Sequence, residues 1–122
     1  MYRTHTCNQL RKEDIGKIVR LAGWVHVSRD HGGVIFIDLR DREGLTQVVF
    51  RPEENAEVAK QAHTLHSEDV IQVKGRVAPR LPGTENPKLP TGDIEVVPSE
   101  LRILNRAHLQ VYSSTGLAFP LQ

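Results

Sequence analysis

Apolar and polar residues alternate along much of the chain, and this period of two predicts strands rather than helices. In the first clear run, three aliphatic side chains share one face: Ile35, Ile37 and Leu39. Phe36 must then point to the opposite face, together with Asp38 and Arg40. In the next run, 45–51, alternation likewise places Gln47 on the face opposite Thr46, Val48 and Phe50. We expect the two runs to pair as a hairpin that displays an aromatic ring outside the core.

The same alternation predicts three more strands, over residues 17–28, 70–78 and about 93–104, the last with a break at Pro98. In the 17–28 strand the predicted inner face consists of Val19, Leu21, Gly23, Val25 and Val27. A glycine such as Gly23 has nothing to pack, which in a small barrel often marks a bend where one strand serves both halves of the sheet. Residues 30–33 end in a glycine pair and are the predicted turn before the hairpin.

The remaining segments lack this alternation. Residues 8–15 are expected to form a short helical turn that ends at Gly16. Apolar residues recur at helical spacing through 56–66 and predict one amphipathic helix, with Val58, Ala62 and Leu65 on its apolar face. Four prolines and two glycines between 79 and 92 exclude regular structure, so a long exposed loop is expected there. Loops of this length are usually functional or disordered.

Three strands, a helix and two strands follow one another in the order of the oligonucleotide-binding (OB) fold. We therefore predict an all-β, five-stranded Greek-key barrel with one capping helix over residues 1–105, and an irregular tail over 106–122. OB folds bind along strands two and three and the flanking loops, where Phe36 and Gln47 are expected. An exposed ring beside an amide suits an unstacked base. The alternative for Phe36 is a place under a neighbouring loop, as satellite core.

Composition narrows the function classes. The chain has 122 residues, with 39% hydrophobic and 25% charged, which suits one domain. A net charge of +1 gives no global attraction for polyanions, so nucleic-acid binding requires a local patch. The single Cys7 and the absence of an apolar leader or spanning segment are consistent with a reducing cytoplasm. The spacing of His63, His66 and Asp69 is weak evidence for zinc, and we expect no metal site.

Two long strings of residues make a family resemblance specific. Residues 29–44, with 47–50 and later Thr-Gly-Asp-Ile-Glu-Val at 91–96, resemble the N-terminal anticodon-binding domain of bacterial-type aspartyl-tRNA synthetase. The resemblance implies base contacts to a G-U-C anticodon: Phe36 stacks on a base, Gln47 binds the central uridine and Glu95 contacts bases. An amide can match both a donor and an acceptor on uracil, and a carboxylate can accept from an exocyclic amine. Alternatively, Gln47 is an ordinary solvent-facing residue and Glu95 forms a cross-strand salt bridge with a residue such as Arg76.

Contacts to phosphates or to the loop are expected from Arg29, His31, Gly32, Gly33, Arg40, Arg51 and Arg76. The family usually has a run of arginines before the first turn, where this chain has Val27 and Ser28. Fewer phosphate contacts should make the affinity less sensitive to salt. His31 and Gly83 lie where the family varies with selectivity, and they resemble relatives that also accept the asparagine anticodon G-U-U. The alternative is that His31 is simply a polar turn residue.

The synthetase resembled is a class II aspartate–tRNA ligase that uses ATP and magnesium in a separate, dimeric catalytic domain. No nucleophile motif or phosphate-binding glycine loop appears in these residues. The resemblance therefore implies that the chain recognises tRNA-Asp, and as a hypothesis tRNA-Asn, as a monomeric domain without its own cofactor or catalytic site. Residues 111–116 do not match the family. Two alternatives stay open: a general single-strand-binding OB module, and a protein-interaction barrel anchored by Phe36.

Overall fold

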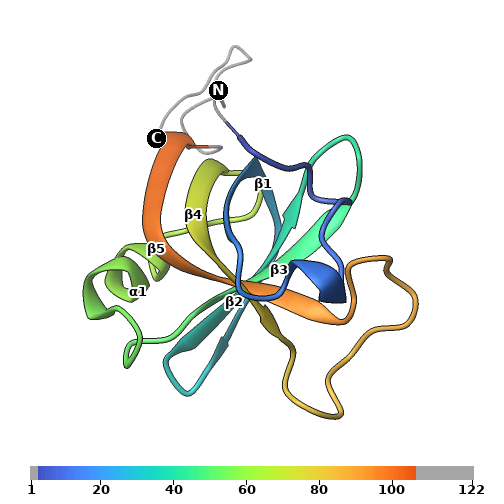
Figure 1. Cartoon of the computed structure of the whole chain (residues 1–122). Helices are drawn as coiled ribbons and strands as arrows, with labels where there is room; N and C mark the ends of the chain where they lie inside the picture. The colour runs from blue at the N-terminus through green and yellow to red at the C-terminus, as the bar shows by residue number, and fades with distance from the viewer. Residues whose placement is uncertain (1–2, 107–122) are drawn as a thin grey trace.

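The five predicted strands close into a barrel (Figure 1). The computed structural model describes residues 3–106, with η1 (Lys12–Asp14), β1 (Ile18–His31), β2 (Val34–Arg40), β3 (Leu45–Phe50), α1 (Ala56–Ala62), β4 (Val70–Pro79) and β5 (Ile94–Asn105). The order around the barrel is β1-β2-β3-β5-β4. All neighbours are antiparallel except β3 and β5, which run parallel. This confirms the predicted OB fold with its capping helix.

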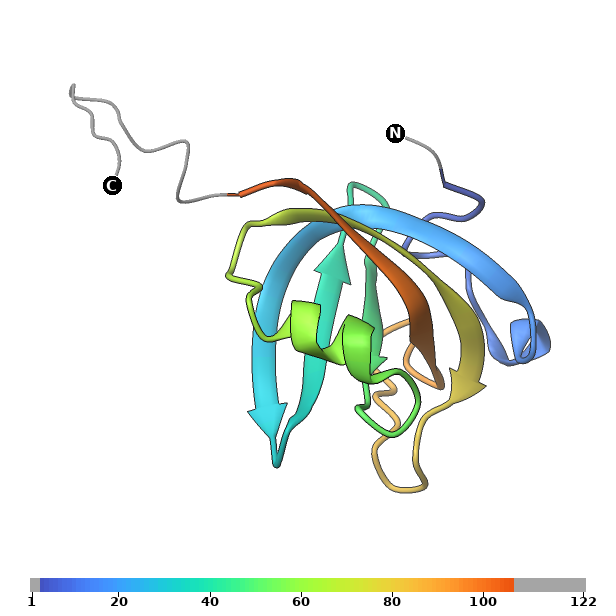
Figure 2. The same ribbon diagram turned by 90° about the vertical axis from the view of Figure 1, so that its left-hand side faces the viewer.

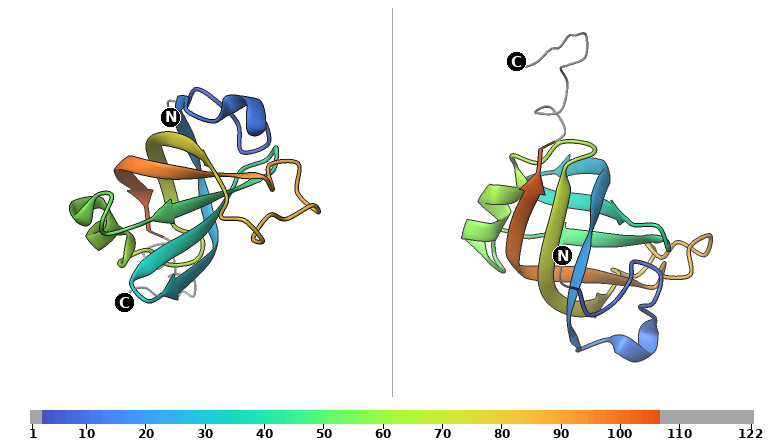
Figure 3. Two further views of the ribbon diagram at one scale, coloured as in Figure 1. Left: turned by 60° about the horizontal axis from the view of Figure 1, so that its bottom comes forward. Right: turned by 90° about the horizontal axis from the view of Figure 1, so that it is seen from above.

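One long strand, β1, joins the two halves of the barrel. Its first half pairs with β4 and its second half with β2, and Trp24 has a partner in both, Val70 and Arg40. β5, β4 and β1 lie side by side in Figure 3, right. Gly23 stands at this change of partner, and a side chain there would collide with the carbonyl oxygen of Arg40. The close approach of two backbones explains why glycine occupies the bend.

A bulge in β1 corrects the predicted alternation. Val25 pairs with Leu39 and Val27 pairs with Asp38, so His26 is the extra residue. An inserted residue reverses the faces of everything after it. Val27 therefore lies on the outer face, and its assignment to the inner face was wrong. The same reversal brings Arg29 opposite Phe36 on the outer surface.

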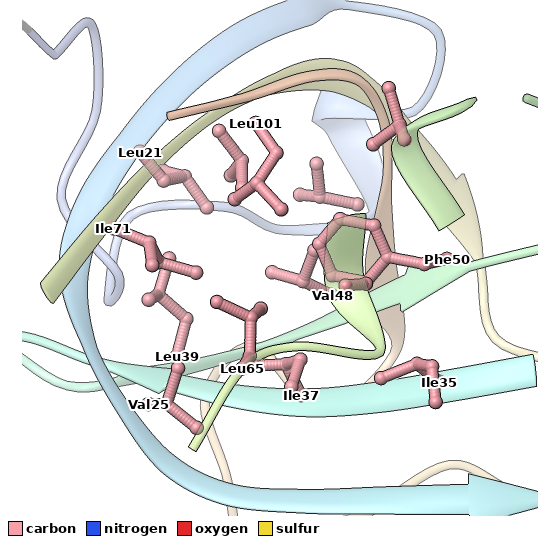
Figure 4. Packing of buried hydrophobic residues seen from close by; sticks show 14 of the residues in the cluster. Leu21, Val25, Ile35, Ile37, Leu39, Val48, Phe50, Leu65, Ile71 and Leu101 are labelled. Carbon is pink, nitrogen blue, oxygen red and sulfur yellow. The ribbon is translucent and has the colours of Figure 1, made fainter. Parts of the chain in front are cut away.

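The core fills the barrel with aliphatic side chains from every strand (Figure 4). Ile37, Leu39 and Val48 are fully buried, and Phe50 is nearly so. The helix α1 covers one end of the barrel (Figure 2) and buries Val58 in the core. At its start the Asn55 side chain accepts a hydrogen bond from the Val58 amide, an N-cap.

Two elements are shorter than predicted. The helix ends at Ala62 rather than at 66, because the backbone turns there and the His66 amide donates to the Asp69 carboxylate. The N-terminal turn is a 3₁₀ helix of only three residues. β5 continues through Pro98, where a break was predicted, because a bulge at Ser99 takes up the change in register.

The β1–β2 hairpin and the loop between β4 and β5 extend from the same side of the barrel (Figures 1 and 2). The hairpin turn is tighter than predicted, with Gly32 and Gly33 at φ values of 63° and 93° and His31 already paired with Val34. Positive φ at both positions is the geometry of a type I′ turn. The predicted tail over 106–122 lies outside the described residues apart from Arg106. No helix within residues 3–106 is long and apolar enough to span a membrane.

Candidate nucleic-acid interface

A groove of about 280 Å³ lies between the hairpin and the β4–β5 loop. Strands β1, β2, β3 and β5, the residue after β3 and the β4–β5 loop all contribute to it. The residues that line it are Arg29, His31, Phe36, Gln47, Arg51, Leu81, Thr84 and Glu95. The three predicted base-binding residues, which lie up to 59 positions apart in the sequence, thus share one groove. We call this set of eight residues the groove.

Phe36 is half-buried and lies outside the core cluster that holds its neighbours Ile35 and Ile37. The His31 ring meets it edge to face, with ring centroids 5.4 Å apart and an interplanar angle of 80°. Such T-shaped pairs are favourable because the positive edge of one ring meets the negative face of the other. The Phe36 ring is therefore held in place while it still forms part of the groove wall, as a stacking platform requires.

Gln47, Glu95 and Arg51 form a nearly closed polar cluster at the base of the groove. Gln47 Nε2 donates to Glu95 Oε1 at 3.2 Å, and Arg51 Nη1 binds Glu95 Oε2 at 3.0 Å. Glu95 is only 3% exposed and Gln47 only 7%. The salt bridge considered for Glu95 does form, but its partner is Arg51 rather than Arg76. The sequence could not reveal this, because Arg51 reaches Glu95 only after β3 and β5 have paired.

Arg29 lies at the rim of the groove and makes two contacts to Asp38, at 3.3 and 3.4 Å. Asp38 is on the outer face of β2 by simple alternation, and the bulge at His26 brings Arg29 of β1 to the same face. This pair is partly exposed, so its ionic contribution to stability is small. The Arg29 guanidinium is thus oriented beside Phe36 and accessible to an anionic ligand.

Sequence reasoning missed Arg80, at the start of the β4–β5 loop. Arg80 is 8% exposed and donates to the carbonyl oxygens of Ile94 and Thr84, which ties the loop to β5 next to Glu95. Burial lowers the pKa of the Arg80 guanidinium, while the carboxylates of Asp38 and Glu95 act in the opposite direction. Because OB-fold loops flank the binding face, the arginine directly after β4 was a signal that could have been used.

Other predicted contacts lie elsewhere. Arg40 is at the opposite end of β2 from Phe36, and its buried Nε has no hydrogen-bond partner among the described residues. Arg76 faces Glu54 at 3.3 Å, outside the groove. Gly32 and Gly33 form the hairpin tip outside the groove lining, and the Gly33 amide donates to Asp30 Oδ1. Among residues 3–106, no group of three potential metal ligands occurs.

The closed strand order and the groove beside β2 and β3 define the class of OB-fold oligonucleotide-binding domains. A family model described as "OB-fold nucleic acid binding domain", of the tRNA anti-codon type, matches residues 19–104. The chain belongs to this family.

Curated and solved relatives give the same picture. The chain is 62% identical over 107 residues to the aspartate–tRNA(Asp/Asn) ligase of Desulfatibacillum aliphaticivorans, with 88% of this chain and 18% of the ligase covered. Asparaginyl-tRNA synthetase from Pyrococcus horikoshii, in complex with asparaginyl-adenylate, superposes with a TM-score of 0.71 at 30% identity, over 88% of this chain and 23% of the synthetase. An OBody bound to hen egg-white lysozyme has a TM-score of 0.75 at 29% identity, over 88% of this chain and 97% of the OBody. The chain therefore spans less than a fifth of the length of the curated ligase that it matches.

Proposed function

We propose that this chain recognises the anticodon loop of tRNA-Asp as the N-terminal part of an aspartate–tRNA ligase. The observation that carries the proposal is the convergence of Phe36, Gln47 and Glu95 in one groove. A base splayed from an RNA loop needs an apolar surface for its face and polar groups for its edge. The groove supplies both within one small volume, on the side of the barrel that OB folds use.

The cationic groups around the groove fit a phosphate backbone. Arg29 is at the rim, and Arg51 is half-buried at the base. Each has a carboxylate partner, so the local excess of positive charge is small. Affinity on this proposal depends on base contacts more than on counterion release.

We also propose that the groove accepts the G-U-U anticodon of tRNA-Asn. His31 lines the groove beside Phe36, and Gly83 belongs to the loop that supplies Leu81 and Thr84. On this proposal the third anticodon base, cytidine or uridine, contacts His31 and the β4–β5 loop. The name of the curated relative, aspartate–tRNA(Asp/Asn) ligase, includes both tRNAs and supports this wider selectivity.

The chain supplies recognition, and on this proposal the chemistry with ATP and magnesium belongs to the remaining part of a cytoplasmic ligase. Binding of an aspartate anticodon stem-loop, compared with the same stem carrying a scrambled loop, tests the proposal by fluorescence anisotropy. We expect a preference of about tenfold or more, the value of one good bidentate base contact. Equal affinity for both loops would instead support the general single-strand-binding module.

A further inference from the structure

Leu81 is an exposed apolar side chain in the lining of the groove. Its exposed fraction is 58%, and among the eight groove residues only Leu81 and Phe36 have pure hydrocarbon side chains. They come from the two flanks of the groove, the β4–β5 loop and strand β2. The other exposed large apolar side chains within residues 3–106, Ile15, Ile18 and Leu104, lie outside the groove. Leu81 is therefore the apolar surface that folding leaves in water and that a ligand in the groove can bury.

A preformed turn holds the backbone of Leu81 in place. The carbonyl oxygen of Leu81 accepts a hydrogen bond from the Thr84 amide at 3.0 Å and another from Thr84 Oγ1 at 2.6 Å. Pro82 and Gly83 occupy the two central positions of this turn, and Gly83 has a φ of 89°. Proline followed by a glycine at positive φ is typical of a type II turn. The Leu81 side chain thus projects from a backbone that is ordered before a ligand arrives.

Arg80 ties this turn to the barrel. Its Nε donates to the carbonyl oxygen of Ile94 at 3.2 Å, and its Nη1 donates to that of Thr84 at 3.4 Å. The guanidinium residue is 8% exposed, whereas the next residue, Leu81, is 58% exposed. This reverses the usual distribution, in which the charged residue is outside and the aliphatic one inside. The anchor keeps Leu81 at the groove, because the loop cannot move away from β5 without breaking these hydrogen bonds.

An unstacked base has two apolar faces, and both must leave water when the base is bound. Phe36 provides a surface for one face. Leu81 is the only other hydrocarbon side chain of the groove and lies on its other flank. An aliphatic side chain has no donor or acceptor, so it contacts the second face through burial and dispersion alone. Such a contact favours every base and leaves the base edge to the polar groups of the groove.

We propose that Leu81 is the second wall of a slot in which one unstacked base is held between Phe36 and Leu81. This inference rests on the proposed function of the groove, and it adds a base-binding residue from the β4–β5 loop. The slot contributes affinity for a base as such, because neither wall can form hydrogen bonds with the base edge.

Leu81→Ala should weaken binding of the G-U-C stem-loop about fivefold, as expected when a ligand buries part of one aliphatic side chain. The slope of log affinity against log salt concentration should not change, because no charge is removed. The matched control is Ile18→Ala. Ile18 is an aliphatic side chain of almost the same exposure, 60%, that lines a different pocket, so this variant should bind as the wild type does. Urea unfolding should give both variants the stability of the wild type, since both side chains are mostly exposed.

Abasic stem-loops show whether Leu81 contacts a base. Each probe of this series lacks one base of the loop and keeps the ribose and phosphate. Leu81→Ala should have no effect on the probe that lacks the base in the slot, and it should keep its effect on the others. Phe36→Ala should lose its effect on the same probe. With the intact loop, the loss in the double variant should be smaller than the sum of the two single losses, because both walls act on one base.

The hexanucleotide U6 separates this inference from the proposed function. Unchanged affinity in Leu81→Ala, or a loss that persists with every abasic probe, would overturn the inference even if the G-U-C stem-loop is preferred over the scrambled one. A coupled loss in the Leu81 and Phe36 variants with U6, without that stem-loop preference, would overturn the proposed function and leave the slot standing. Failure of the wild type to bind any probe would overturn both.

Discussion

The His31 ring packs edge to face against Phe36, which joins the tip of the β1–β2 hairpin to the wall of the groove. The contact spans the hairpin, because His31 pairs with Val34 in the strand ladder and Phe36 follows two residues later. It fixes an aromatic platform on an element that extends from the barrel. A platform that is ordered before the ligand arrives loses little conformational entropy on binding.

Phe36→Ala should weaken binding of the G-U-C stem-loop by about 1–3 kcal/mol, the usual value of stacking one base on an aromatic ring. Phe36→Leu keeps apolar bulk without a π face and should recover only part of this loss. The matched control is Leu104→Ala, which removes an exposed apolar side chain near the far end of β5. Isothermal titration with the three variants measures the effect. Unchanged affinity in Phe36→Ala would show that the ring does not stack on the RNA.

The wild type should bind the G-U-C and G-U-U stem-loops with affinities that differ by less than about tenfold, which is less than one full base contact. His31→Ala removes the ring that orders Phe36, so it should weaken both complexes by about 0.5–1.5 kcal/mol, the value of an aromatic pair. Competition between the two labelled stem-loops measures the ratio directly. A strong preference for G-U-C in the wild type would contradict the relaxed selectivity proposed for this groove.

The strands and their inner faces could be predicted from sequence because alternation is a local property. Ile35, Ile37 and Leu39 are buried as their spacing requires, with Phe36 outside the core cluster. A bulge leaves no periodic signature, so the outer position of Val27 was not predictable by counting residues. Nor was the contact between Arg51 and Glu95, because it depends on the pairing of β3 with β5, which are distant in the sequence. The register of the strand pairs could not be predicted from the sequence, and this register decides which charged side chains form ion pairs.

The outer position of Val27 gives a test of the electrostatic contribution. Val27 lies opposite Asp38 on the groove side of β1, where related sequences were expected to carry arginine. Val27→Arg should add a phosphate contact and steepen the slope of log affinity against log salt concentration by about 0.7, the value for one contact to a single strand. Lys74→Ala, on β4 and outside the groove, should leave the slope unchanged. Titrations at several salt concentrations give both slopes. An unchanged slope in Val27→Arg would mean that the phosphate backbone of the RNA does not pass along this edge of β1.

The Arg51–Glu95 pair should matter for folding as well as for binding. Arg51→Ala leaves the Glu95 carboxylate buried without its counterion, so the free energy of unfolding should fall by about 3–5 kcal/mol. Arg76→Ala breaks an ion pair of the same residue types in which both side chains are exposed, and it should cost less than about 1 kcal/mol. Urea unfolding of the two variants compares them directly. Equal losses would mean that burial of the pair contributes nothing.

Cys7 makes stability depend on pH in the alkaline range. Burial raises the pKa of its thiol far above the ordinary value, and the nearby Asp41 carboxylate raises it further. The folded protein therefore keeps the proton after the unfolded chain, with a thiol pKa of about 8.5, has released it. Below pH 8 this group has no effect on the pH dependence, whereas above about pH 9 the free energy of unfolding should fall by up to about 1.4 kcal/mol per pH unit. Cys7→Ala should remove this part of the slope whatever its absolute stability, and urea unfolding between pH 7 and pH 10 measures it. The same slope in both proteins would mean that the thiol ionises in the folded state as readily as in the unfolded chain.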